Sequence, residues 1–257
     1  MRNILITAAY DGTDFSGWQR QAENRTVQGE IESALEKIHK KRVPLTGAGR
    51  TDAGVHAVSQ AANFYTDIDS MDTGRFVPAL NNLLPKDVRI TSAREVEENF
   101  HARFSAVMRS YRYYIICGRQ ALPHENRYAH QIWRRPSVQT LNYYARLLHG
   151  EFDCSLFASP ADSVFTRGSG SAHRYIRNAY FFIEGEKLVF EISANAFFWK
   201  MVRCVTGTLL RCEEKSVPLG EFKKLLKEGD HSAAGPTIPP NGLFLWQVEY
   251  GKQQFCH

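Results

Sequence analysis

The sequence lacks the features of a membrane-spanning, secreted or disulfide-rich protein. No apolar run approaches eighteen residues, and the N-terminus turns polar within a few positions, so we expect neither a membrane span nor a secretory signal. The five cysteines are an odd number, are widely spaced and form no C-x-x-C pair. This pattern argues against a disulfide framework and a cysteine zinc site, and it favours a reducing, cytoplasmic location.

Composition is unremarkable for a folded chain. Of the 257 residues, 43% are hydrophobic and 23% are charged, which excludes disordered and collagen-like classes. The length allows one large domain or two smaller ones, each with a real core.

Positive charge is unevenly distributed along the chain, whose net charge is +5. Residues 1–103 hold 13 Lys or Arg and 14 Asp or Glu, whereas residues 104–257 hold 19 and 13. We therefore place a domain division between these two segments. The basic excess of the second one favours a polyanionic partner.

The excess is densest over residues 109–135, where six arginines accompany one acid, Glu125, and tyrosines and Trp133 are interleaved with them. Arginines bind phosphates and aromatic faces stack on bases, so this mixture suits a nucleic-acid site. A solvated strand face with arginine stems over tyrosines is the other interpretation that composition allows. If the first one holds, Arg112 and Arg134 contact phosphates, and losing either flattens the salt dependence of binding.

The first segment predicts the order of a split βαβ, ferredoxin-like unit. Thr26 is a good N-cap for a helix with apolar residues at helical spacing. A second helix is predicted over 73–83. The predicted strands cover residues 3–9, 42–47, 60–65 and 87–95.

The second segment predicts another mixture of strands and helices, so the fold class is α+β. Residues 158–173 are rich in Ser, Gly and Ala and are expected to form a surface loop. Helices are predicted over 137–149, 197–212 and 218–228, and strands over 107–117, 174–184, 187–194 and 242–250.

The most unusual segment is the glycine loop, residues 47–57, with the sequence GAGRTDAGVHA. Its start is like a dinucleotide fingerprint, but Asp52 replaces the third glycine and would repel a pyrophosphate. No Gly-Lys-Ser/Thr follows, so it is not a Walker loop either. Asp52 lies two residues from Arg50, which would keep a carboxylate ionised. From spacing alone Asp52 is a nucleophile, a general base or a turn former. His56 is expected to pack or to support a reacting residue rather than to be a catalyst.

Eight motifs in order make the chain resemble the TruA family of tRNA pseudouridine synthases. The glycine loop is the most specific of them. The others are Y-D-G-T and G-W-Q within residues 10–19, T-V-Q at 26–28, F-H-A-R at 100–103, R-S-Y-R-Y at 109–113, M-V-R at 201–203 and G-L at 242–243.

This resemblance implies an isomerase that converts uridine to pseudouridine at positions 38, 39 and 40 of the tRNA anticodon stem-loop, without cofactor or metal. The uridine must be flipped out of its stack to be reached. Asp52 would be the nucleophile, attacking either C6 of the base or C1′ of the ribose, and Arg50 would pair with it and displace the uridine. Tyr111 would pack on the flipped base and accept a proton, and Leu243 would line the pocket. The substrate-binding set would also include Arg109, Arg112 and Arg203.

The resemblance also implies two ferredoxin-like or RRM-like domains with joined antiparallel sheets, a central catalytic cleft, and a homodimer that binds tRNA. The apolar helix at 197–212 would be a dimer element or a core helix of one subunit. The chain departs from the family pattern at 210–217, where a glycine-rich turn is missing, and at 158–173.

Two other functions stay open from the sequence. A non-catalytic tRNA-binding protein or chaperone would use the same cleft without needing Asp52. A nucleotide-cofactor enzyme would use the loop at Gly47–Gly49, and NAD or ATP binding would reveal it.

Overall fold

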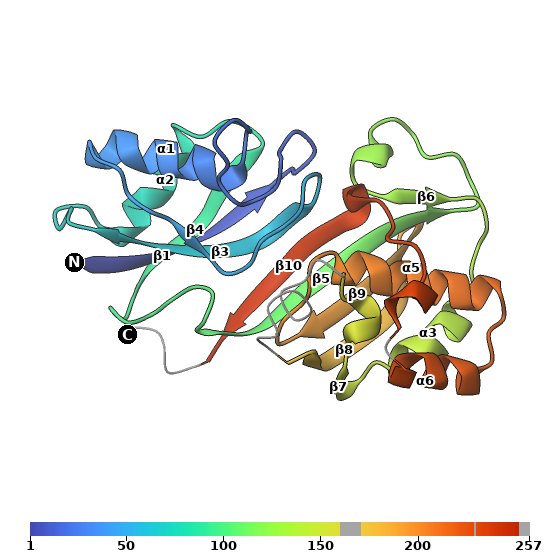
Figure 1. Cartoon of the computed structure of the whole chain (residues 1–257). Helices are drawn as coiled ribbons and strands as arrows, with labels where there is room; N and C mark the ends of the chain where they lie inside the picture. Colours follow the sequence, from blue (N-terminus) through green and yellow to red (C-terminus); the bar gives the residue numbers. More distant parts are fainter. Residues whose placement is uncertain (160–170, 229, 252–257) are drawn as a thin grey trace. The chain divides into compact units, whose positions relative to one another are not determined.

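The computed structural model describes residues 1–159, 171–228 and 230–251. The chain forms two compact units: Met1–Arg109 with Phe244–His257, and Ser110–Leu243. Both combine helices with mostly antiparallel strands, which confirms the predicted α+β class (Figure 1). The chain passes from the first unit to the second within the strand Ala106–Cys117. It returns to the first unit at the start of its last strand, Leu243–Tyr250.

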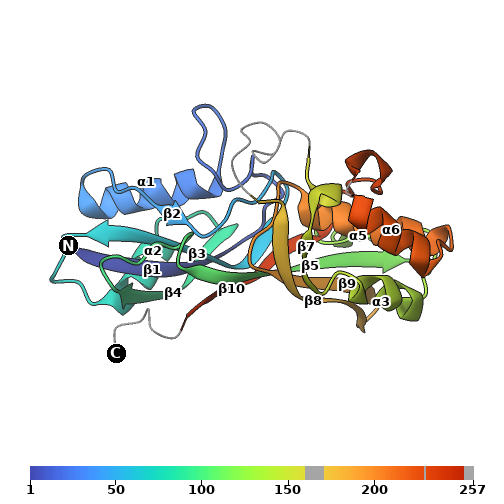
Figure 2. The same cartoon turned by 60° about the horizontal axis from the view of Figure 1, so that its bottom comes forward.

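The first unit has the predicted ferredoxin-like order. Its strands pair in the order β4-β1-β3-β2, and each neighbouring pair is antiparallel. Helix α1 runs along one face of this sheet and contacts α2 (Figure 2). The elements are β1 (Arg2–Tyr10), α1 (Val27–His39), β2 (Thr46–Gly47), β3 (His56–Thr66), a 3-10 turn (Thr73–Arg75), α2 (Phe76–Asn81) and β4 (Val88–Val96).

Local signals account for both ends of α1. The Thr26 hydroxyl accepts a hydrogen bond from the Gly29 amide at 3.3 Å, as an N-cap does. At the other end Lys40 adopts a left-handed conformation with φ of 57°, which stops the helix. Buried Val27, Ile31 and Leu35 attach the helix to the sheet.

The strand predicted over 42–47 is reduced to β2, Thr46–Gly47. Pro44 has no amide to donate to a ladder. The amide of Leu45 donates instead to the Glu32 carboxylate of α1 at 3.1 Å. Residues 44 and 45 therefore have no amide available for sheet pairing, and the strand is limited to Thr46–Gly47.

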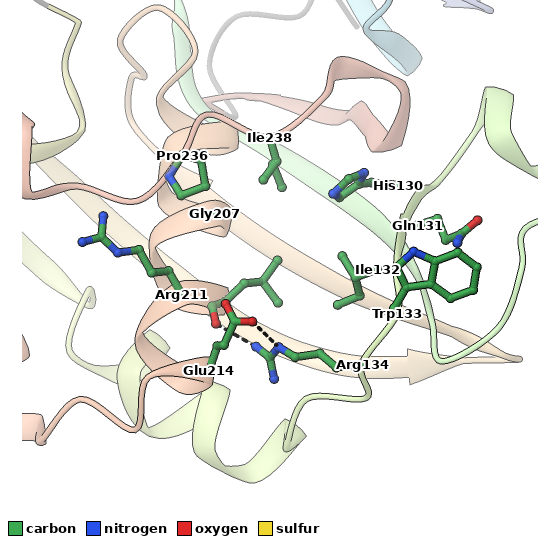
Figure 3. A pocket seen from close by; sticks show the side chains of 11 residues that line it. His130, Gln131, Ile132, Trp133, Arg134, Gly207, Arg211, Glu214, Pro236 and Ile238 are labelled. Carbon is green, nitrogen blue, oxygen red and sulfur yellow. Dashed lines mark hydrogen bonds and ion pairs between the residues drawn. The ribbon is translucent and has the colours of Figure 1, made fainter.

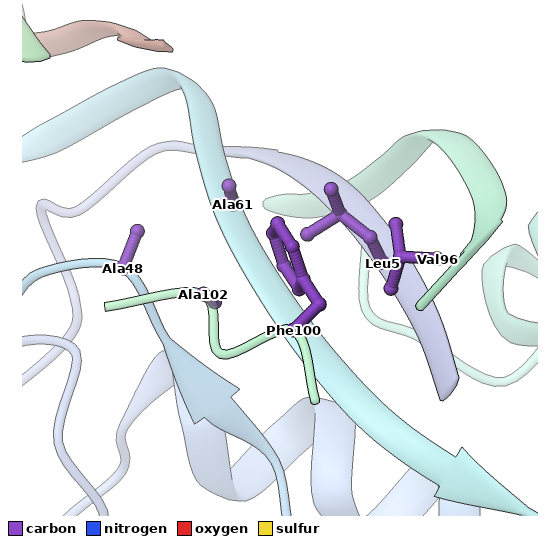
Figure 4. Packing of buried hydrophobic residues seen from close by; sticks show 6 residues of the cluster. All are labelled: Leu5, Ala48, Ala61, Val96, Phe100 and Ala102. Atoms are coloured by element: carbon purple, nitrogen blue, oxygen red, sulfur yellow. The ribbon is translucent and has the colours of Figure 1, made fainter. Parts of the chain in front are cut away.

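The last strand, β10 (Leu243–Tyr250), completes the first unit. It pairs in parallel with β3, Phe244 opposite His56 and Leu245 opposite Ala57. Val248 and Tyr250 pack against a buried cluster that includes Ala48, the second residue of the glycine loop, so the loop is anchored in the core near its start. The cluster comprises Leu5, Ala48, Ala61, Val96, Phe100 and Ala102 (Figure 4).

The second unit has the strand order β5-β9-β8-β7, and β6 pairs in parallel with β5. The strands predicted over 107–117, 174–184 and 187–194 and the helices over 137–149 and 218–228 are all present. The elements are β5 (Ala106–Cys117), β6 (His130–Ile132), α3 (Val138–Arg146), β7 (Gly150–Asp153), β8 (His173–Glu184), β9 (Lys187–Ala194), α5 (Met201–Glu214) and α6 (Leu219–Glu228).

The apolar helix begins later than predicted, at Met201 rather than at residue 197. Lys200 has a φ of 59°, which breaks the helical path, so Phe197 precedes the helix. Within the unit α5 is buried on most of its surface. A Cβ on Gly207 would lie 1.9 Å from the Pro236 carbonyl oxygen, so the 236–238 segment covers α5 closely. This favours the interpretation of α5 as a core helix.

The two atypical segments differ in what the structure describes of them. Helix α5 continues through the first of them to Glu214, and Glu213 accepts a hydrogen bond from the Ser137 amide at 2.8 Å. Most of the second, residues 160–170, lies outside the described residues. No helix of the described chain is long and apolar enough to cross a membrane.

Candidate active site

The glycine loop presents one carboxylate from a fixed backbone. Asp52 is partly exposed and Arg50 is exposed. The loop is attached at its start, where the Ala48 amide donates to the Ala61 carbonyl at 2.8 Å. After Asp52 it turns, with the Val55 amide donating to the Asp52 carbonyl at 3.2 Å and Gly54 at a φ of 77°. A fixed loop with an accessible carboxylate is what a nucleophile or a base requires.

A second segment, the aromatic turn (residues 10–19), encloses the glycine loop. The Trp18 amide donates to the Thr51 carbonyl at 3.0 Å. Gly17 has a φ of 97°, and a Cβ there would lie 2.7 Å from the same carbonyl oxygen. The Trp18 indole lies against Gly47, where a Cβ would approach its nitrogen to 2.5 Å. Its three large aromatics, Tyr10, Phe15 and Trp18, are all buried, and their presence in so short a polar segment is the sequence signal that it packs.

His56 is buried and joins three segments. Its Nδ1 accepts the Gly12 amide at 3.0 Å, and its ring stacks on Phe244 with centroids 4.6 Å apart. Asp11 Oδ1 lies 3.2 Å from the same nitrogen. His56 therefore packs between the aromatic turn and β10, which agrees with the expectation that it supports the fold of the site rather than reacting.

Tyr111 and Leu243 belong to the second unit. Tyr111 lies on β5, is 9% exposed, and meets the edge of the Phe197 ring with centroids 5.1 Å apart. Leu243 is buried and follows Gly242, where a Cβ would lie 2.9 Å from the Tyr113 ring. The structure thus brings residues 242–243 against β5. Asp52 and Arg50 belong to the first unit.

The three arginines of the predicted substrate-binding set, Arg109, Arg112 and Arg203, all have partners within the protein. Arg109 donates to the carbonyls of Ala48 at 3.1 Å, Arg103 at 2.6 Å and Ala106 at 3.0 Å. Arg112 and Arg203 have other partners. Arg112 binds the carboxylates of Glu191 at 2.7 Å and Glu184 at 3.3 Å, and Arg203 donates to the Ile238 carbonyl at 2.7 Å.

Two further arginines of the basic segment, residues 109–135, are also paired with carboxylates. Arg119 binds Glu125 at 2.7 Å and Glu186 at 3.0 Å, and its hydrogen bonds lower the pKa of the Glu125 carboxyl to about 2. Arg134 binds Glu213 and also lies 3.7 Å from Glu214. Carboxylates remote in sequence therefore neutralise much of a segment that is strongly basic when taken alone.

The second unit also holds an open pocket of about 470 Å³ that the sequence did not predict (Figure 3). Its floor is apolar, and Trp133 at its rim is 71% exposed. Burial lowers the pKa of His130, which keeps this imidazole neutral at neutral pH. The lining includes His130, Ile132, Trp133, Arg211, Glu214 and Ile238.

The described residues include no group of three or more His, Cys, Asp or Glu arranged to hold a metal ion. The glycine loop offers one partly exposed carboxylate, Asp52, two residues after an exposed arginine, Arg50. With a ferredoxin-like first unit and a second α+β unit, this places the chain in the class of α+β proteins that carry an accessible carboxylate on a glycine-rich loop.

Comparison with known proteins identifies the family. The model of the tRNA pseudouridine synthase family matches residues 6–105 and 144–251. The tRNA pseudouridine synthase A of Treponema denticola is 50% identical over 254 residues, covering 97% of this chain and 93% of the relative. That of Brachyspira hyodysenteriae is 39% identical over 247 residues, covering 95% and 97%. That of Anoxybacillus flavithermus is 40% identical over 254 residues, covering 97% and 99%.

The chain belongs to the tRNA pseudouridine synthase family. This confirms the resemblance inferred from the motifs, and with it a cofactor-independent isomerase of uridine in tRNA. The first matched region contains Arg50 and Asp52, and the second contains Arg203 and Leu243. Tyr111 lies between the two matched regions.

Proposed function

We propose that Asp52 is the nucleophile with which this enzyme converts uridine to pseudouridine, and that its targets are positions 38, 39 and 40 of the tRNA anticodon stem-loop. The observation that carries the proposal is the fixed loop that presents Asp52 partly exposed beside Arg50. An anionic oxygen held in one place can attack C6 of the base or C1′ of the ribose. The N-glycosidic bond then breaks, the base rotates, and its C5 bonds to C1′. The bond to Asp52 breaks in turn, C5 loses its proton and N1 gains one, so that Asp52 is regenerated.

The other site residues would handle the flipped uridine. Arg50 is exposed and would displace the uridine from its stack while pairing with Asp52. Tyr111 would pack on the base, supported by Phe197, and would accept a proton late in the reaction. Leu243 would supply an apolar wall.

We propose a changed role for three arginines of the substrate-binding set. Arg109 and Arg203 donate to backbone carbonyls, and Arg112 is paired with carboxylates. Arg109 would act on the substrate by holding Ala48 of the glycine loop. Arg203 would act by holding the segment that leads to Leu243. Arg112 would contribute little to phosphate binding.

We also propose that the enzyme is a cytoplasmic homodimer that binds tRNA. The four cysteines within the described residues are free, and burial raises the pKa of the Cys154 thiol to about 12, as suits thiols kept in a reducing cytoplasm. The dimer rests on the resemblance of the chain to homodimeric relatives. Light scattering after gel filtration tests it, and a monomer at micromolar concentration would contradict it.

Pseudouridine mapping on unmodified tRNA transcripts tests the function. We expect the native protein to form pseudouridine at positions 38–40 and Asp52→Ala to form none, with tRNA affinity kept within about threefold because the rest of the site is unchanged. Product from Asp52→Ala at a comparable rate would show that another group is the nucleophile. Tight binding without any product from the native protein would favour the non-catalytic role.

A further inference from the structure

We propose that Tyr10 is a positioning residue for Asp52 and acts through the hydroxyl of Thr51. This inference rests on the proposed role of Asp52 as nucleophile. Tyr10 is the last residue of β1, and Thr51 directly precedes Asp52. The Tyr10 Oη and Thr51 Oγ1 atoms are 2.7 Å apart. The two residues are 5% and 7% exposed, so water competes poorly for this hydrogen bond.

The bond fixes the backbone immediately before the nucleophile. Threonine is branched at Cβ, so holding its hydroxyl also fixes its χ1 angle and with it the direction of the main chain. The Trp18 amide holds the carbonyl of the same residue at 3.0 Å. The aromatic turn thus forms hydrogen bonds with both the side chain and the carbonyl of Thr51. The peptide that joins Thr51 to Asp52 is held from both sides.

The aromatic turn also holds the loop after Asp52. The Gly54 amide donates to the Phe15 carbonyl at 3.4 Å, and His56 Nδ1 accepts the Gly12 amide at 3.0 Å. A Cβ on Gly12 would lie 2.0 Å from the Val55 carbonyl oxygen, so this approach needs glycine. The loop is therefore held on both sides of Asp52, while the Asp52 side chain is left accessible.

This arrangement predicts a loss in turnover rather than in binding. Tyr10 is buried beneath the loop and would not touch the substrate, so removing its hydroxyl leaves the RNA-facing surface in place. It releases the backbone at Thr51 and lets the Asp52 carboxylate depart from its reactive position. A displacement of about 1 Å is enough to lower a rate by about a hundredfold.

The test measures kcat and KM with tRNA transcripts for the full chain. Tyr10→Phe and Thr51→Val should each lower kcat by about tenfold or more and leave KM within about twofold. Thr51→Ser, which keeps the hydroxyl, should restore most of kcat. The double variant should be no worse than the worse single one, because both remove one bond. Tyr65→Phe is the matched control: it removes a tyrosine hydroxyl that donates to the Glu98 carbonyl at 2.8 Å, away from the loop, and should leave kcat unchanged.

Thermal unfolding of each variant distinguishes positioning from general destabilisation, with all assays run well below the lowest melting temperature. Wild-type kcat in Tyr10→Phe, or equal losses in Thr51→Ser and Thr51→Val, would overturn the positioning role. If Tyr10→Phe does not fold, the Thr51 pair decides alone. Activity in Asp52→Ala would remove the proposed nucleophile instead, and this result is separate from the outcome for Tyr10.

Discussion

At the scale of single residues, the site separates groups that face the substrate from groups that hold them. Asp52 and Arg50 are at least partly exposed, whereas Thr51 between them is buried and bonded to Tyr10. Exposure thus alternates over residues 50–52. The side chains of Arg50 and Asp52 can meet a substrate, while the buried side chain of Thr51 holds the backbone in place. Tyr111 on β5 is held in a similar way, because its ring packs in a T-shaped contact with that of Phe197.

Removing the hydroxyl of Tyr111 should separate binding from turnover. We expect Tyr111→Phe to keep tRNA affinity, because the ring and its contact with Phe197 remain, and to lower kcat by about 10²-fold or more through loss of a proton acceptor. Single-turnover kinetics with tRNA transcripts measures this. Equal turnover in the two proteins would remove any role for the hydroxyl.

Tyr113→Phe is the contrasting variant two residues along the same strand. The Tyr113 hydroxyl donates to the Pro239 carbonyl at 2.6 Å, and burial raises the pKa of its phenol. Its loss leaves a buried carbonyl without this donor, which should lower the free energy of unfolding by about 1–3 kcal/mol. The two variants should therefore affect different measurements.

At the scale of elements, hydrophobic periodicity predicted most helices and strands, and backbone chemistry explains the exceptions. The α1 helix and its Thr26 cap follow from the sequence, because capping and apolar spacing are local. The strand at 42–47 was overestimated, since Glu32 takes the Leu45 amide from thirteen residues away. The start of α5 was placed too early because the left-handed conformation of Lys200 leaves no mark on the apolar pattern.

The candidate site was predictable only as far as its motifs. The glycine loop made Asp52 and Arg50 candidates, but spacing alone also allowed a turn former, and only the resemblance to the family gave the two residues roles. The bond between Tyr10 and Thr51 could not be predicted, because it joins residues forty-one positions apart. Nor could the pairing of Arg112 with Glu191, which lies on another strand. Contacts of this kind depend on sheet pairing, which the sequence pattern does not specify.

Close packing of α5 gives a prediction at this scale. A Cβ on Gly207 would lie 1.9 Å from the Pro236 carbonyl oxygen, and backbone cannot move aside cheaply. We expect Gly207→Ala to lower the free energy of unfolding by about 1–3 kcal/mol through overpacking. Gly220→Ala in α6 is the control, because a Cβ there meets no atom within 4 Å and should raise helix stability by up to about 1 kcal/mol. Denaturant unfolding of the two variants measures these changes in the free energy of unfolding. A change of the same sign in both variants would contradict the packing argument.

At the scale of the whole molecule, the charge that suggested a polyanionic partner is distributed differently in space than along the sequence. Residues 104–257 have six more basic than acidic side chains. Yet Arg112, Arg119 and Arg134, all in the most basic segment, are bound to carboxylates. The carboxylate in each pair cancels most of the charge of the arginine, so the pair attracts a phosphate only weakly. The net charge therefore still favours tRNA, but local arginine density does not locate the contact.

The salt dependence of tRNA binding tests this view. Losing one phosphate contact should reduce the slope of log K against log salt concentration by about 0.7–0.9. We expect Arg112→Gln and Arg134→Gln to change the slope by clearly less than this, because their carboxylate partners already neutralise them. Filter binding over a series of salt concentrations measures both. A full reduction for Arg112→Gln would mean that RNA displaces Glu191 from the guanidinium on binding, and the basic segment would then be the RNA-binding surface that its sequence suggests.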